Sequence, residues 1–130
     1  MSDICPFCEI AVSDSNNRIV LKKELGFAIR DGYPISEGHT LIIPKRHVAS
    51  FFELADAEKA ALFNLLNEAK EALDQKYRPA AYNIGINDGA AAGQTVPHVH
   101  IHLIPRYEGD VKDPRGGIRW IKPDKANYWD

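Results

Sequence analysis

Apolar residues in the first fifty positions fall into short runs separated by polar residues and turn formers. Three of these runs have the composition of strands: residues 19–21, 27–29 and 39–43. Leu25-Gly26 lies between the first two runs and can form a turn or a bulge, and Pro44 ends the third run. The pattern therefore predicts a β-hairpin followed by a third strand.

Farther along the chain, the spacing of apolar residues becomes helical. The apolar side chains recur three or four positions apart at Leu54, Ala61, Leu62, Leu65, Leu66, Ala69 and Leu73. Asp56 can cap the N-terminus of such a helix, and Pro79 cannot continue it. We therefore expect one long amphipathic helix from Asp56 to about Tyr77.

Alternation of apolar and polar residues returns in two segments after this helix. Residues 81–86 and 96–104 alternate in this way, which is the pattern of half-buried strands. Five short strands, with one long helix between the third and the fourth, favour an α+β domain with an antiparallel sheet. Prolines and glycines break the pattern after residue 108, so we expect residues 108–130 to be an irregular C-terminal tail. We expect residues 1–130 to form a single domain that includes this tail.

The tail carries three large aromatic residues, Trp120, Tyr128 and Trp129. Leaving such side chains fully exposed is costly, so we expect the tail to pack against other atoms. Its contact surface could be a sister subunit, the functional site or the core of its own domain.

Composition and charge narrow the functional class. The chain has 130 residues, of which 45% are hydrophobic, and a domain of this size does not need disulfides to fold. No apolar run approaches the length of a membrane span and no secretory signal is visible, so we expect a cytoplasmic protein with no membrane partner. A net charge of −2 argues against binding a nucleic acid polymer. An anionic ligand would have to be bound by local groups.

Three of the five histidines, His98, His100 and His102, occupy alternate positions of the expected strand 96–104. Alternate residues of a strand face one side, about 6.5 to 7 Å apart, where two imidazolium ions would repel by about 2 kcal/mol. At least one histidine should therefore be neutral near pH 7. A neutral imidazole can be a nucleophile or general base, and a protonated one can hold an anion. A single histidine is more often a hydrogen-bonded core residue, but three in alternation favour chemistry.

Metal binding by these histidines is an alternative. A flat strand separates the outer two by about 13 Å, whereas bonds from zinc to imidazole nitrogen are about 2.1 Å, so all three cannot converge on one ion. Two of the three could still hold a catalytic metal.

A loop of small and polar residues, 87–95, precedes the histidines. Its backbone amides, with the Gln94 and Thr95 side chains, could cradle an anion beside the imidazoles. If the preceding strand pairs with the histidine strand, Gly85 leaves room for a ligand. The loop and the histidines together predict a phosphate-binding site.

Two segments resemble a known family. Residues 93–106, with histidines alternating with hydrophobic residues, resemble the signature of the histidine triad (HIT) superfamily, and residues 38–45 resemble its second motif. The resemblance implies a HIT-like fold with a five-stranded antiparallel sheet, one long helix and a short N-terminal helix. It also implies a homodimer with a continuous ten-stranded sheet. The implied activity is hydrolysis or transfer of a nucleoside monophosphate from a phosphoanhydride, phosphoramidate or similar ester.

The resemblance also implies roles for individual residues. The middle histidine, His100, would be the nucleophile that takes up the nucleotidyl group. His102 would contact the phosphate, His98 would complete the catalytic triad, and His39 would be a buried neighbour that orients it. The implied substrate contacts are Asp31 at the ribose hydroxyls, with Asn87, Gly93, Gln94, Thr95 and Val96 at the phosphates.

The motif Cys5-Pro6-Phe7-Cys8 has three interpretations. Its spacing resembles the redox motif of glutaredoxins, but only four residues precede Cys5, whereas that motif follows a strand and opens a helix. A pair of buried, unreactive thiols is the second interpretation. The third is a structural zinc site, which needs two more ligands.

Several bacterial histidine triad proteins use a zinc set of two cysteines and two histidines. The resemblance implies that Cys5, Cys8, His47 and His98 form this set here, and we favour zinc over free thiols. A zinc-bound His98 cannot also protonate the leaving group. The zinc would therefore be structural, and the proton would come from another group or from solvent.

The Gln94-Thr95 loop is most similar to that of the fragile histidine triad branch, which cleaves diadenosine polyphosphates. The leading hypothesis is therefore a two-step hydrolase acting on a purine nucleotide, in which His100 attacks the α-phosphorus and water releases the product. Arg115 and Arg119 of the tail could stabilise the developing charge. The alternatives are a metal-dependent hydrolase that uses two triad histidines and a module that binds nucleotides without turnover.

Overall fold

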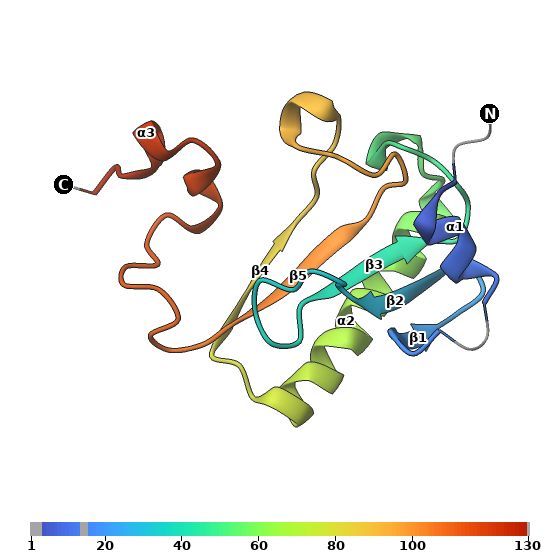
Figure 1. Cartoon of the computed structure of the whole chain (residues 1–130), viewed down its shortest axis with the longest axis horizontal. Coiled ribbons are helices and arrows are strands. Elements are labelled where there is room, and N and C mark those ends of the chain that lie inside the picture. Colours follow the sequence, from blue (N-terminus) through green and yellow to red (C-terminus); the bar gives the residue numbers. More distant parts are fainter. Residues whose placement is uncertain (1–3, 14–15, 130) are drawn as a thin grey trace.

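The computed structural model describes residues 4–13 and 16–129 and has the predicted α+β architecture, with a five-stranded antiparallel sheet (Figure 1). The strand order is β1-β2-β3-β5-β4. The strands are β1 (Ile19–Lys22), β2 (Gly26–Arg30), β3 (Thr40–Pro44), β4 (Ala81–Gly85) and β5 (Ile101–Arg106). The helices are α1 (Pro6–Ala11), α2 (Asp56–Tyr77) and α3 (Pro123–Ala126), with 3-10 turns η1 (Phe51–Glu53), η2 (Ala90–Ala92) and η3 (Gly117–Ile121).

The two faces of the sheet are covered to different extents. The long helix α2 packs its buried leucines on one face, against Ile42, Ile101 and Leu103. On the other face, Phe7 and Ile10 of α1 join the buried side chains of β2 and β3. Because α1 has only six residues, β4 and β5 remain open on this second face. We call it the open face.

The long helix has the predicted bounds but not the predicted cap. Asp56 is its first residue rather than its N-cap, because the cap position is Ala55, whose N–H donates to Oε1 of Glu58 at 2.8 Å. The helix ends where Arg78 takes a left-handed conformation just before Pro79. No helix among the described residues is long and apolar enough to cross a membrane.

The last strand is shorter than the sequence predicts. Residues 96–100 were expected to belong to it, but β5 begins at Ile101. Pro97 has no N–H for a ladder, and the Val99 N–H donates instead to the carbonyl of Val48 at 2.8 Å, beyond the end of β3. His98 and His100 therefore lie on an irregular segment. The prediction that all three triad histidines face one side of a strand is wrong.

The C-terminal tail is irregular, as expected, apart from η3 and α3. It extends beyond the edge strand β4, at the opposite end of the molecule from α1 (Figure 1). Its aromatic residues are only partly covered, since Trp120 is 47% and Tyr128 70% exposed. Of the three surfaces that the sequence left open for the tail, the functional site is the one to which the tail contributes lining residues, namely Ile118, Ile121 and Lys122.

Candidate active site

A cavity of about 1000 Å³ opens on the open face between α1, the η2 loop and the tail. We call it the triad cavity. Eight of the residues for which substrate or catalytic roles were predicted line it: Asp31, Asn87, Gly93, Gln94, Thr95, Val96, His100 and His102. His98 does not line it and is buried beneath. Gly85 also lines the cavity, and a Cβ added to it would meet nothing within 4 Å, so the space predicted there is open.

His100 is held by the backbone in one tautomer. Its Nδ1 lies 3.0 Å from the carbonyl oxygen of His98. A carbonyl only accepts hydrogen bonds, so Nδ1 carries the proton and Nε2 of the neutral ring has a free lone pair. Phe7 packs edge-on against the ring, with centroids 5.0 Å apart. The ring is therefore fixed with a nucleophilic nitrogen available at the cavity.

A chain of hydrogen bonds gives His102 the opposite tautomer. The Ile35 N–H donates to Nδ1 of His39 at 3.2 Å, which places the His39 proton on Nε2. That Nε2–H faces Nδ1 of His102 at 2.9 Å and Oδ2 of Asp31 at 3.3 Å. Nδ1 of His102 therefore accepts, and its Nε2 carries the proton. His102 can thus donate a hydrogen bond to an anion while remaining neutral.

Burial supports this neutral state. Burial, together with the neighbouring His100 and His39 rings, lowers the pKa of His102 to about 4. Burial also lowers the pKa of His39. The rings of His100 and His102 lie 5.0 Å apart, centroid to centroid. The burial and the hydrogen-bond pattern of His102 both favour the expected neutral state of at least one triad histidine near pH 7.

The lowered pKa predicts acid sensitivity of the fold. Between pH 6.5 and about 4 the unfolded chain protonates His102 and the folded chain does not, so the free energy of unfolding should fall as the pH falls through this window. His102 should account for up to about 3 kcal/mol of this loss. Urea unfolding of the wild type and of His102→Gln at pH 7 and pH 4.5 measures the difference. Equal acid losses in the two proteins would contradict the assignment.

The third triad histidine belongs to a separate cluster. Nδ1 of His98 lies 3.3 Å from Sγ of Cys5, 3.5 Å from Sγ of Cys8 and 3.3 Å from Nδ1 of His47. The Nδ1 of His47 is also 3.2 Å from Sγ of Cys8. On its other side, Nε2 of His98 donates to the carbonyl of Pro44 at 2.7 Å, which leaves a lone pair on Nδ1. The sequence-predicted set is thus brought together with its donor atoms converging.

These separations fit a tetrahedral zinc ion. In a tetrahedron, bonds of about 2.3 Å to sulfur and about 2.05 Å to nitrogen place two nitrogens about 3.3 Å apart, a nitrogen and a sulfur about 3.6 Å apart, and two sulfurs about 3.8 Å apart. The nitrogen–nitrogen and nitrogen–sulfur separations in the cluster are close to these values. The His98 to Pro44 hydrogen bond is the kind of outer contact that fixes a histidine ligand. The four residues can therefore hold zinc, which would tie α1 to the segment that carries His100.

Catalytic metal binding by two triad histidines has less support. A second group of potential ligands comprises Asp31, His39 and His102. Within the described parts of the chain, neither this group nor the cysteine cluster contains two triad histidines. His100 belongs to neither.

The loop before the histidines is organised by Gln94. Its Oε1 accepts from the Gly89 N–H, and its Nε2 donates to the carbonyls of Ala49 and Val96. Asp88 anchors the other side by accepting from Ser50 Oγ and the Phe51 N–H. The Gln94 side chain therefore shapes the loop from within, although its sequence position suggested a direct anion contact.

Sequence reasoning missed several residues of the cavity. Arg18 and Lys122 line it, whereas Arg115 and Arg119, which were expected to supply positive charge, do not. Arg115 pairs with Asp113, and Arg119 donates to carbonyls within the tail. Arg18 and Lys122 lie far from the histidine motif in sequence, and no local pattern marks them. Only the fold brings them to the cavity.

Comparison with known proteins agrees with this geometry. The family model described as HIT domain matches residues 12–109. The chain belongs to the HIT family. An uncharacterized HIT-like protein of Methanocaldococcus jannaschii is 40% identical over 82% of this HIT chain and 82% of its own length. The bis(5'-nucleosyl)-tetraphosphatase (asymmetrical) of Schizosaccharomyces pombe is 37% identical over 75% of this chain and 53% of its own.

A solved structure also bears on the cysteine cluster. A zinc-bound histidine triad family protein from Mycobacterium smegmatis superposes with a TM-score of 0.76 and 34% identity, over 84% of this chain and 79% of that one. The HIT fold that the sequence resemblance implied is therefore confirmed. A zinc site at Cys5, Cys8, His47 and His98 is compatible with both the geometry and this relative.

Proposed function

We propose that this HIT protein hydrolyses dinucleoside polyphosphates through a nucleotidyl-histidine intermediate on His100. The observation that carries the proposal is the pair of opposite tautomers at one cavity: an unprotonated Nε2 on His100 beside an Nε2–H on His102. Attack on a phosphorus atom requires two groups: a nucleophile, and a hydrogen-bond donor that stabilises the charge on the phosphoryl oxygens. The S. pombe tetraphosphatase supports the choice of substrate class.

The proposed reaction has two steps. Nε2 of His100 attacks the α-phosphorus, the anhydride P–O bond breaks, and the remaining nucleotide leaves with that electron pair. Water then cleaves the P–N bond, which releases a nucleoside monophosphate and restores His100. The Nε2–H of His102 and the ammonium group of Lys122 would stabilise charge on the phosphoryl oxygens in both steps.

The remaining residues would bind and orient the substrate. Asp31 would hold the ribose hydroxyls through the remaining lone pairs of its carboxylate, whose Oδ1 accepts from the Tyr33 N–H at 2.8 Å and whose Oδ2 lies 3.3 Å from Nε2 of His39. Asn87 and the 93–96 loop would contact the phosphates. Zinc, when bound, would supply structural cross-linking only, and His98 would hold His100 through its backbone carbonyl. The leaving-group proton would then come from solvent or another group.

We also propose a homodimer. Strand β4 is an edge strand, which leaves a row of backbone donors and acceptors without a neighbouring strand. Pairing of two β4 strands would satisfy these backbone groups and extend the sheet to ten strands. Sedimentation equilibrium should therefore give twice the chain mass.

The substrate assignment predicts the products of a simple screen. Adenosine and guanosine dinucleoside tetraphosphates should be cleaved, with a nucleoside monophosphate as one product in each case. Chromatography of the products after incubation with purified protein, with and without a chelator, is the measurement. Turnover confined to nucleoside phosphoramidates would contradict the proposed substrate class. Activity that is lost on chelation and restored by metal would favour the metallohydrolase, and tight binding without products would favour a binding module.

A further inference from the structure

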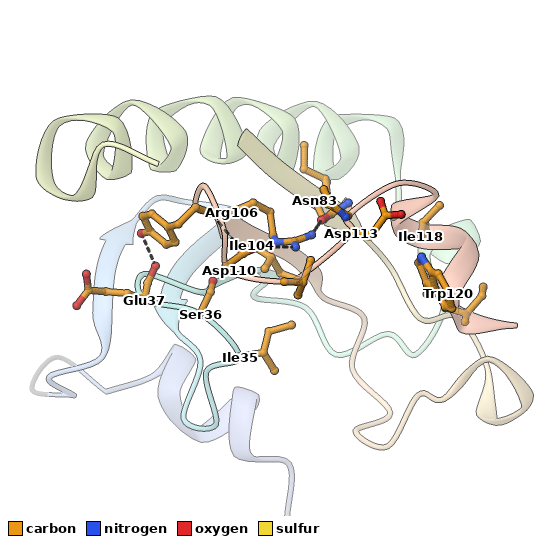
Figure 2. Close-up of a pocket in the computed structure, with 17 residues that line it drawn as sticks. Ile35, Ser36, Glu37, Asn83, Ile104, Arg106, Asp110, Asp113, Ile118 and Trp120 are labelled. Atoms are coloured by element: carbon orange, nitrogen blue, oxygen red, sulfur yellow. Dashed lines mark hydrogen bonds and ion pairs between the residues drawn. The ribbon is translucent and has the colours of Figure 1, made fainter. Parts of the chain in front are cut away.

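A second cavity, of about 800 Å³, lies beside the triad cavity on the open face. We call it the tail groove. Figure 2 shows Ile104 and Arg106 of the sheet on one side and Ile118 and Trp120 of the tail on the other. Most of its wall is apolar, and several of its isoleucines are largely exposed in the chain as it stands, including Ile35 at 75% and Ile121 at 78%. An open apolar wall of this kind marks a binding surface.

The tail groove is continuous with the triad cavity. Five residues line both spaces: Ile35, Gly85, Ile104, Ile118 and Ile121. Gly85 is one of these shared residues, and a Cβ there would meet nothing within 4 Å, so the space above Gly85 is open. A ligand whose phosphate sits at His100 can therefore extend into the tail groove.

The charges of the tail groove exclude a second phosphate site. Its cation, Arg106, is already committed to Asp110 at 2.8 Å and to Asn83 at 2.7 Å (Figure 2). Asp113 is paired with Arg115. No uncompensated positive charge lines the groove among the described residues, whereas Lys122 lies at the triad cavity. A neutral ligand group is therefore favoured in the groove and the phosphates are favoured at the histidines.

The groove offers the contacts that a nucleoside needs. The Trp120 ring is fixed by its Nε1–H, which donates to the Arg115 carbonyl at 2.8 Å, and remains half exposed. A nucleobase can stack on such a ring without a requirement for one base. Ser36 lines the same groove, and its Oγ is buried with no hydrogen-bond partner among the described residues. A polar atom of a ligand could bond this Oγ once the side chain turns toward the groove.

Resting on the proposed function, we propose that the tail groove binds the second nucleoside of a dinucleoside polyphosphate, with its base stacked on Trp120. Each cavity has the size of a site for one small ligand, of roughly 300 to 1,000 Å³. Two such cavities that share a wall, one of them lined by the catalytic histidines, match a substrate with a nucleoside at each end. The tail thereby favours a substrate with a nucleoside at each end over a nucleotide with a small leaving group.

Kinetics of Trp120→Ala test this assignment. The KM for a dinucleoside tetraphosphate should rise about tenfold, as for loss of one base-aromatic stack. The inhibition constant of the corresponding nucleoside monophosphate should not change, because that product occupies only the triad cavity. Trp129→Phe is the matched control, since Trp129 does not line the groove. Equal effects on substrate and product, or none on either, would overturn the proposal.

A binding readout separates this inference from the proposed catalysis. In the double variant His100→Ala/Trp129→Phe, Trp120 is the single tryptophan. The dinucleoside tetraphosphate should quench its fluorescence, whereas the nucleoside monophosphate should bind without quenching. This result can be obtained even if the wild type hydrolyses neither nucleotide. Emission that depends on protein concentration but not on the dinucleotide would show a second copy of the chain in the groove and would overturn the proposal.

Discussion

Replacing His100 with alanine is expected to lower kcat for dinucleoside polyphosphate hydrolysis by about 10,000-fold or more, while the affinity for nucleoside monophosphate changes little. The change removes the only triad nitrogen that the backbone leaves unprotonated at the cavity. Asp31, Asn87 and the 93–96 loop remain to bind nucleotide. Steady-state kinetics and calorimetric titration of the monophosphate measure the two effects separately.

The other triad histidines provide matched controls for this result. His102→Ala should lower kcat by only about 100-fold, because it removes one hydrogen bond to the phosphoryl oxygens and leaves the nucleophile in place. His98→Ala should act chiefly through stability, since His98 is buried outside the cavity. Near-normal turnover by His100→Ala would contradict the mechanism and would favour a metal-activated water.

Purified protein is expected to contain about one zinc ion per chain and to lose about 4 kcal/mol of unfolding free energy when the zinc is removed. That magnitude corresponds to a ligand present at about 1,000 times its dissociation constant. Zinc contributes more in small peptides that have no core of their own. Elemental analysis and urea unfolding before and after chelation measure both quantities.

Cys8→Ser and His100→Ala form a contrasting pair for the zinc prediction. Cys8→Ser should lose zinc and stability, because Cys8 contacts both His47 and His98. His100→Ala should keep both, because it lies outside the cluster. Metal-free wild type with two freely titratable thiols, and no change in stability on chelation, would reject the zinc site.

The sequence predicted those helices and strands whose positions follow from the local spacing of apolar residues. The apolar period located α2 to within one residue at each end, and the run before Pro44 located β3. The histidine alternation indicated the site, although not its geometry. That geometry depends on the pairing of β3 with β5 stopping at Ile42 and Ile101, although β3 itself continues to Pro44, and on the Val99 N–H donating to the carbonyl of Val48.

The roles of the individual histidines could be assigned only once the fold was known. The tautomers of His100 and His102 are set by a backbone carbonyl and by His39, neither of which any spacing rule identifies. Asp31 was predicted from the resemblance as a ribose contact, yet it also lies 3.3 Å from His39. The tail groove could not be predicted, because it forms between Trp120 and strands that lie far from it in sequence.

Trapping of the covalent intermediate tests the central claim most directly. A dinucleoside tetraphosphate labelled in its α-phosphate would be mixed with wild-type protein, quenched within milliseconds under alkaline conditions, and the labelled peptide mapped. An acid-labile nucleotidyl group on His100, absent from His100→Ala, is the predicted result. Label on another residue, or turnover in the wild type with no covalent label at any time, would contradict the account.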